Sequence, residues 1–108
     1  FVPKEIVGEL DFLCVHLYPV AGKTKDALDT LAGFAAGKPV VVEETFPLNC
    51  SPQELAEFLD GSKNSAAGWI GFYWGRPPAE LRRSGRFQDA IMLDWLGLFE
   101  RGAKRMAK

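Results

Sequence analysis

The middle of the chain contains the stretch Lys38-Pro39-Val40-Val41-Val42-Glu43-Glu44, which decides the predicted fold. Its three consecutive valines do not alternate with polar residues, as the residues of a strand with one wet face would. A continuous apolar run of this length is typical of a strand that is covered on both faces, and such strands belong to parallel sheets. We therefore expect an α/β fold with a parallel sheet.

Two further runs have the same character and extend the prediction to three strands. They are Asp11-Phe12-Leu13-Cys14-Val15-His16-Leu17-Tyr18 and Gly68-Trp69-Ile70-Gly71-Phe72-Tyr73-Trp74. Phe12, Val40 and Ile70, one from each run, lie 28 and 30 residues apart. A (β/α)₈ barrel uses about 31 residues for each strand–helix unit. The spacing therefore predicts three parallel βα units, which is a partial TIM barrel.

Helical patterns lie between these strands. After the first strand, apolar residues recur at helical spacing at Ala27, Leu28, Leu31, Ala32 and Ala35, and Gly37 then ends the pattern. The tetrapeptide Ser51-Pro52-Gln53-Glu54 is a capping box with proline at the first helical position, so a helix should begin there and end at Asp60-Gly61. A long polar loop is expected from Gly75 to Arg86, followed by an amphipathic helix from about Phe87 to about Arg105.

Length and composition exclude several classes of protein. The 108 residues suffice for one domain, predicted over residues 1–108, and the 47% apolar and 25% charged residues are typical of a globular chain. The net charge of −1 gives no positive field for nucleic acid. The longest apolar stretch, residues 66–74, is far shorter than the roughly 20 residues of a membrane helix, so no membrane partner is expected. A signal peptide would lie outside this sequence, so the compartment is not predicted.

The two cysteines, Cys14 and Cys50, do not form a disulfide framework. We interpret them as free thiols, with a single bridge between them as the alternative. The segment Cys14-Val15-His16 resembles a metal-ligand pair, but two ligands do not make a site, so no metal is expected.

Chemically useful side chains follow the three strands at their carboxyl ends. In a strand, alternate side chains share a face, which groups Phe12, Cys14, His16 and Tyr18, then Val40, Val42 and Glu44, then Ile70, Phe72 and Trp74. This parity places Glu43 on the face opposite Glu44, and it makes Phe12, Val40, Val42, Ile70 and Phe72 the filling of a barrel interior. Active sites of parallel α/β folds lie at the carboxyl ends of the strands.

The candidate site residues are therefore Glu44, His16, Tyr18 and Trp74. Each alone has a structural explanation, such as a hydrogen-bonded core histidine or a tryptophan packed in the core, and only their combination at three strand ends favours a site. The carboxylate of Glu44 needs donors, which His16 and Tyr18 can supply. Trp74 offers a flat face on which a sugar ring can stack. The set suits attack on an oxocarbenium-like centre.

These motifs, in this order, resemble the last three strands of a retaining glycoside hydrolase of family five, the cellulase and mannanase family of (β/α)₈ enzymes. In that family the sixth strand ends in His-x-Tyr, the seventh opens with a Lys-Pro-like pair and ends in the nucleophilic glutamate, and the eighth ends in a tryptophan that floors a sugar subsite. The resemblance implies Glu44 as the nucleophile, His16 and Tyr18 as its hydrogen-bonding supports, and Trp74 as the platform. It also implies a β-linked carbohydrate substrate and no cofactor.

The sequence departs from that family in two places. Thr45-Phe46-Pro47 follows the glutamate where members commonly have Phe-Gly or a similar small pair. The family's acid/base glutamate lies in an Asn-Glu pair, and no such pair occurs in these residues. Asp11 begins the first strand, about 17 Å from its end, and Glu54 is occupied in the capping box. We therefore expect a C-terminal portion of the barrel that is inactive alone, with the acid/base residue outside it.

A rival interpretation is a small α/β module that binds a ligand or a protein and catalyses nothing, with the same strand ends forming a cleft. In a partial barrel the first and third strands are open sheet edges beside uncovered apolar side chains. For this reason the chain by itself is expected to form a homo-oligomer.

Overall fold

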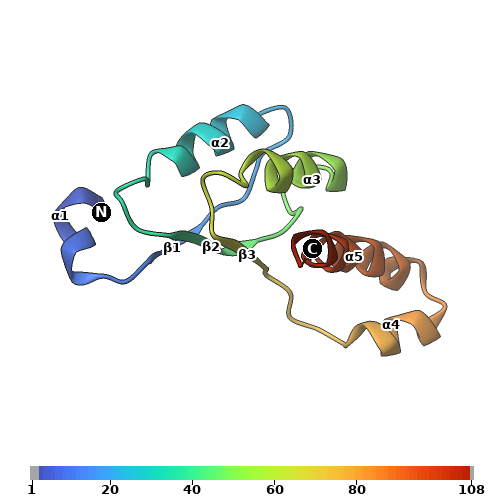
Figure 1. Cartoon of the computed structure of the whole chain (residues 1–108). Helices are drawn as coiled ribbons and strands as arrows, with labels where there is room; N and C mark the ends of the chain where they lie inside the picture. Colours follow the sequence, from blue (N-terminus) through green and yellow to red (C-terminus); the bar gives the residue numbers. More distant parts are fainter. Residues whose placement is uncertain (1–2, 108) are drawn as a thin grey trace. The chain divides into compact units, whose positions relative to one another are not determined.

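The computed structural model describes residues 3–107, which form an α/β fold with a three-stranded parallel sheet and five α-helices (Figure 1). The chain divides into two compact units, Phe1–Phe72 and Tyr73–Lys108. The first unit holds, in order, α1 (Pro3–Ile6), a 3₁₀ turn (Val7–Glu9), β1 (Leu13–His16), α2 (Thr24–Ala32), β2 (Val40–Thr45), α3 (Pro52–Gly61) and β3 (Gly68–Gly71). The second unit holds α4 (Pro78–Ser84) and α5 (Phe87–Met106).

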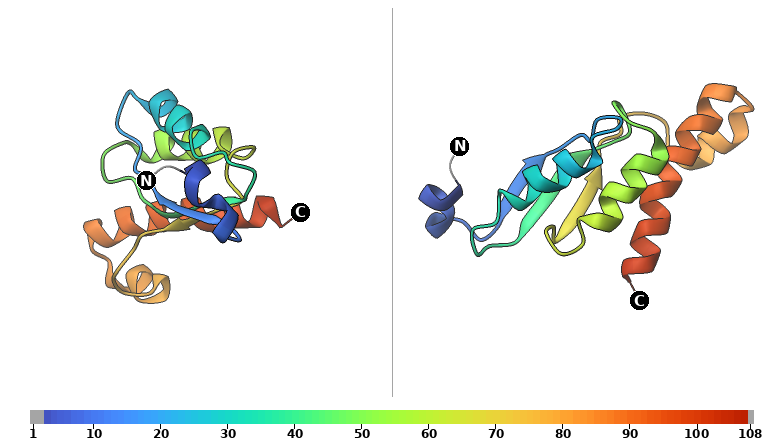
Figure 2. Two further views of the ribbon diagram at one scale, coloured as in Figure 1. Left: turned by 90° about the vertical axis from the view of Figure 1, so that its left-hand side faces the viewer. Right: turned by 90° about the horizontal axis from the view of Figure 1, so that it is seen from above.

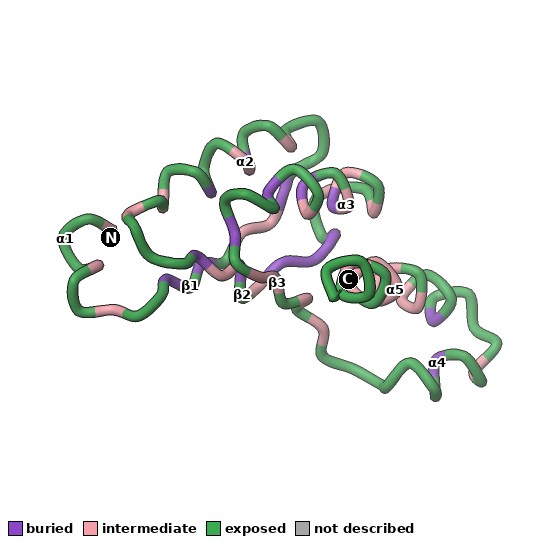
Figure 3. Tube along the Cα trace, viewed as in Figure 1, coloured by how far each residue is buried: buried purple, intermediate pink, exposed green. Residues whose placement is uncertain are grey.

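The strands lie in the order β1-β2-β3, and both neighbouring pairs are parallel. This confirms the predicted parallel α/β arrangement with helices between the strands. In the first unit, α2 and α3 lie side by side over one face of the sheet (Figure 2). The core of this unit lies between those helices and the sheet, and Figure 3 shows buried positions on the strands and on both helices. The buried side chains include Leu13, Val15, Val40, Val42, Leu31, Leu55 and Phe58.

The register of β1 against β2 corrects the predicted strand faces. Leu13 pairs with Val40 and Val15 pairs with Val42, and all four side chains are buried. Paired residues of a parallel sheet point to the same face, so Val40 and Val42 lie beneath the helices with the buried residues of β1. The prediction that Val40 and Val42 share a face with Phe12 is therefore wrong.

The opposite face of the sheet is open. Its apolar side chains Phe12, Ile70 and Phe72 are 52%, 57% and 51% exposed, although each belongs to or adjoins a strand. Cys14 and His16 are exposed on the same side. We call this surface the open face, and the surface beneath α2 and α3 the covered face.

A one-residue bulge interrupts β2 near its carboxyl end. Val15 pairs with Val42 but His16 pairs with Glu44, and on the other side Val42 pairs with Trp69 while Thr45 pairs with Gly71. Strand β2 therefore has one residue more than either neighbour, and its parity changes there. Val42 and Thr45 both lie on the covered face and are fully buried, while the two residues between them are turned to the open face.

Helix α3 begins at the predicted capping box. The Ser51 side chain accepts a hydrogen bond from the Glu54 backbone N–H at 3.1 Å, and the Glu54 carboxylate accepts one from the Ser51 backbone N–H at 2.8 Å. The same carboxylate accepts a bond from the backbone N–H of Gly22 at 2.7 Å. The hydrogen bonds from Gly22 and Ser51 lower the pKa of Glu54, and the bond from Gly22 has the largest effect. The capping box therefore also fastens the loop after β1.

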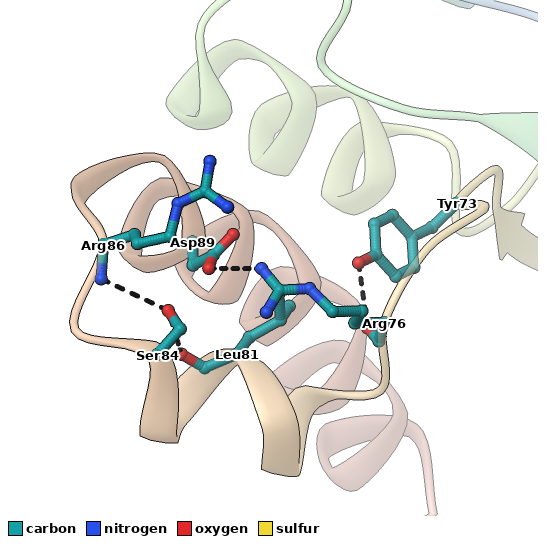
Figure 4. A network of polar contacts seen from close by, with 6 residues as sticks. All are labelled: Tyr73, Arg76, Leu81, Ser84, Arg86 and Asp89. Carbon is teal, nitrogen blue, oxygen red and sulfur yellow. Dashed lines mark hydrogen bonds and ion pairs between the residues drawn. The ribbon is translucent and has the colours of Figure 1, made fainter.

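The second unit is a helical pair that begins in a segment predicted as loop. We expected residues 75–86 to be irregular, but α4 occupies Pro78–Ser84, with proline at its first position and Gly85 ending it at φ +66°. Arg76 forms an ion pair with Asp89 of α5, and the Tyr73 hydroxyl donates to the Arg76 carbonyl at 2.9 Å (Figure 4). A proline-started helix of two turns is too short for an apolar period to reveal it.

Candidate functional site

The carboxylate of Glu44 lies between two predicted partners from β1 and the loop that follows it. The Tyr18 hydroxyl donates to Glu44 Oε1 at 2.5 Å, and His16 Nδ1 lies 3.3 Å from Glu44 Oε2. Both oxygens of the carboxylate therefore face a group of the neighbouring segment. The Glu44 side chain is 24% exposed, so the carboxylate remains reachable from solvent.

Burial and the contact with Glu44 raise the pKa of the Tyr18 phenol to about 12. Burial is the larger cause, because the phenolate is poorly solvated there, and the neighbouring carboxylate adds repulsion. Tyr18 therefore stays protonated at neutral pH and acts only as a donor toward Glu44.

A second carboxylate meets the same histidine. Glu43 Oε1 lies 2.9 Å from His16 Nε2, so the imidazole stands between Glu43 and Glu44. Cys14 also donates a side-chain hydrogen bond to Glu43. The bonds from Cys14 and His16 lower the pKa of Glu43, and the contact with that carboxylate raises the pKa of the Cys14 thiol. Both cysteines are free thiols.

The bulge in β2 explains how two consecutive glutamates reach one histidine. In a regular strand Glu43 and Glu44 would point to opposite faces. The extra residue turns both toward the open face, between Val42 and Thr45 on the covered face. The prediction that Glu43 points away from Glu44 is therefore wrong, whereas Glu44 lies beside His16 and Tyr18 as expected.

Two loops at the carboxyl ends of β1 and β2 are tied together beside these residues. The backbone N–H of Leu17 donates to the Glu44 carbonyl at 3.0 Å, and that of Ala21 donates to the Asn49 carbonyl at 2.8 Å. With the bond from Gly22 to Glu54, these contacts fasten the loop after β1 to the segment that opens α3. The backbone that carries Tyr18 is thereby held.

Trp74, the fourth predicted site residue, belongs to the second unit, Tyr73–Lys108. Its side chain is 96% exposed, so it is not a core residue of that unit. An indole so completely exposed has a free face for a flat ligand.

Sequence reasoning missed Glu43 and Cys14 as neighbours of His16. A signal was nevertheless present, because a regular strand would have placed one of the two consecutive glutamates beneath the helices. An unpaired carboxylate there would be costly, so the Glu43-Glu44 pair itself favours a bulge. Once Glu43 is placed on the open face, Cys14 is expected to lie near it, because Cys14 is on the same face of β1 as His16.

Comparison with known proteins finds no matching family model, no matching curated protein and no matching solved structure. Within residues 3–107, no group of three or more His, Cys, Asp or Glu side chains is arranged to hold a metal ion. No helix in that range is long and apolar enough to cross a bilayer.

Proposed function

We propose that the chain is the C-terminal portion of a retaining glycoside hydrolase barrel, with Glu44 as the nucleophile toward β-linked poly- or oligosaccharides. The observation that supports this proposal most directly is the environment of the Glu44 carboxylate. One of its oxygens accepts a hydrogen bond from the Tyr18 hydroxyl, and the other faces His16. A carboxylate fixed by neighbours and still reachable is what a nucleophile at an anomeric carbon requires.

The proposed roles follow from the contacts. Tyr18 orients Glu44 by a hydrogen bond that persists at neutral pH, because the pKa of the phenol is about 12. His16 faces the second oxygen and limits rotation of the carboxylate. Trp74 supplies an exposed indole on which a sugar ring can stack. The general acid/base glutamate is proposed to lie outside these 108 residues.

The first test of the proposal is the DNA upstream of the codon for Phe1. The proposal expects one reading frame that continues through five more βα units, with Asn-Glu at the end of the fourth strand. An unrelated domain or a start codon directly before Phe1 would contradict it and favour the non-catalytic α/β binding module.

The second test is covalent trapping on the protein encoded by the complete reading frame. The probe is 2,4-dinitrophenyl 2-deoxy-2-fluoro-β-cellobioside, with the β-mannobioside analogue alongside. A Glu44 oxygen attacks the anomeric carbon, the bond to the aryl oxygen breaks, and dinitrophenolate leaves with the electron pair. This leaving group needs no proton, so the step is independent of the acid/base residue.

Peptide mapping by mass spectrometry should place the glycosyl group on Glu44. Glu44→Gln should remain unlabelled, while Glu57→Gln, a matched change on the exposed side of α3, should label like the parent. Label on another carboxylate, or none with either probe, would overturn the assignment of Glu44.

A further inference from the structure

The proposed nucleophile leaves one close contact of the open face unexplained, which is the contact between Glu43 and His16. Glu43 Oε1 lies 2.9 Å from Nε2, on the side of the ring opposite the nitrogen that faces Glu44. The contact depends on the bulge, because a regular β2 would turn Glu43 to the covered face. It is therefore a product of the same backbone irregularity that presents Glu44.

We propose that Glu43 is a positioning residue, which accepts a hydrogen bond from Nε2 of His16 and so keeps the ring turned with Nδ1 toward Glu44. Its catalytic consequence rests on the proposed function of Glu44, whereas the contact itself does not. Glu43 need not touch a substrate for this role, since it acts through the imidazole.

The acceptor chemistry of the two carboxylates supports this role. An ionised carboxylate only accepts hydrogen bonds, and a neutral imidazole has a single N–H to donate. With a carboxylate at each ring nitrogen, both contacts become hydrogen bonds when both nitrogens carry protons. The pKa of Glu43 lies below its ordinary value, so this carboxylate is ionised at neutral pH.

Two further titratable groups, Cys14 and Tyr18, interact with the carboxylates that flank the histidine. Cys14 of β1 donates to Glu43 rather than to the ring, and Tyr18 donates to Glu44. The hydrogen bond from Tyr18 fixes the Glu44 carboxylate, and the ring of His16 lies between that carboxylate and Glu43. A ring flip would exchange its nitrogens for carbons and lose the contact with Glu43.

The test uses the fact that His16 is the one histidine in the 108 residues, so its ring signals need no assignment. Imidazole ¹⁵N spectra of this chain should show an Nε2–H that is protected from rapid solvent exchange by its hydrogen bond to Glu43. Glu43→Ala should remove the Nε2–H signal and restore rapid solvent exchange there. The control Glu57→Ala removes an equal charge on α3 and should leave the ring spectrum unchanged. An unchanged ring spectrum in Glu43→Ala, with the fold intact by backbone shifts, would overturn the proposal.

A kinetic measurement on the protein from the complete reading frame separates the two proposals. Glu43→Ala should lower kcat by roughly tenfold with little change in KM, because the loosened ring affects the orientation of Glu44 and leaves sugar contacts in place. If Glu43→Ala changes the ring spectrum while Glu44→Gln retains turnover, the proposed function fails and the contact stands. If Glu44 is labelled and Glu43→Ala leaves both ring and kcat unchanged, only the positioning role fails.

Discussion

The covered face and the open face belong to the same three strands, yet they contain different kinds of residue. The covered face is a dry layer of small and medium apolar side chains, including Val15 and Val42, beneath α2 and α3. The open face has half-exposed aromatic and aliphatic residues, and its carboxyl end carries His16, Glu43 and Glu44. The buried apolar contacts thus lie on one side of the sheet and the candidate site residues on the other, so substitutions on the two faces should have separable effects.

The largest difference between the effect on activity and the effect on stability is expected for Glu44→Ala in the protein from the complete reading frame. Turnover of aryl β-cellobioside or β-mannobioside should fall by at least about 10³-fold, because the proposed function assigns the attack on the sugar to this carboxylate. Azide should restore part of the rate by occupying the vacated space, while urea unfolding should show a change of less than about 1 kcal/mol in free energy of unfolding. Inactivation by Glu43→Ala together with normal turnover in Glu44→Ala would exchange the roles of the two glutamates.

Two phenylalanine substitutions, one on each side of the sheet, compare how much the two faces contribute to the free energy of unfolding. Phe58→Ala removes a fully buried ring from α3 and should cost about 3–5 kcal/mol of unfolding free energy, through lost burial and a residual cavity. Phe72→Ala on the open face should cost less than about 1 kcal/mol, because its ring is already half exposed. Urea unfolding of both variants checks this, and equal losses would mean that the open face is covered in solution.

That possibility is tested directly by light scattering after size-exclusion chromatography. Because β1 and β3 are sheet edges and Phe12, Ile70 and Phe72 are half exposed, we expect the chain to self-associate at micromolar concentration. Replacing Ile70 by Lys should shift the population toward monomer. A folded monomer at every concentration would contradict the expected homo-oligomer.

A pH effect is expected at the contact between Tyr18 and Glu44. An ordinary tyrosine ionises near pH 10, whereas the pKa of Tyr18 in the fold is about 12. Since the folded pKa is the higher one, the stabilisation is fully present below about pH 10 and is lost as pH rises toward 12. Urea midpoints measured through this window should fall, and Tyr18→Phe should flatten the decline. An equal decline in Tyr18→Phe would assign the effect to other groups.

The smallest effect is expected at Thr45, which follows the two glutamates on the covered face. Its hydroxyl is buried and makes no hydrogen bond within the described part of the chain. Thr45→Val keeps the shape and removes this unpaired group, so the protein should gain about 1 kcal/mol of unfolding free energy. A loss of stability in thermal or urea unfolding would reveal a partner for the hydroxyl.

Much of the first unit could be predicted from local patterns, because its strands are continuous apolar runs and α3 begins at a capping box. The meeting of Glu44 with His16 and Tyr18 was also predictable from their positions at strand ends. The residues of the covered and open faces could not be predicted in this way, because strict alternation along β2 ignores the bulge. It places Val40 and Val42 on the open face, whereas both lie on the covered face. A bulge is fixed by pairing with both neighbours, which a single strand does not encode. Helix α4 could not be predicted, because a helix of two turns has too few apolar positions to show a helical period.

The extra residue in β2 also determines how this strand tolerates changes of length. Deleting Glu43 would leave Val42, Glu44 and Thr45 in regular alternation, with the two buried residues still on the covered face and Glu44 still on the open one. Deleting Val42 instead would draw a glutamate beneath the helices, where its charge would be unpaired. Strand β2 should therefore tolerate deletion of a residue within the bulge far better than deletion of a residue that precedes the bulge. The reason is that the bulge contains the one residue by which β2 exceeds its paired neighbours.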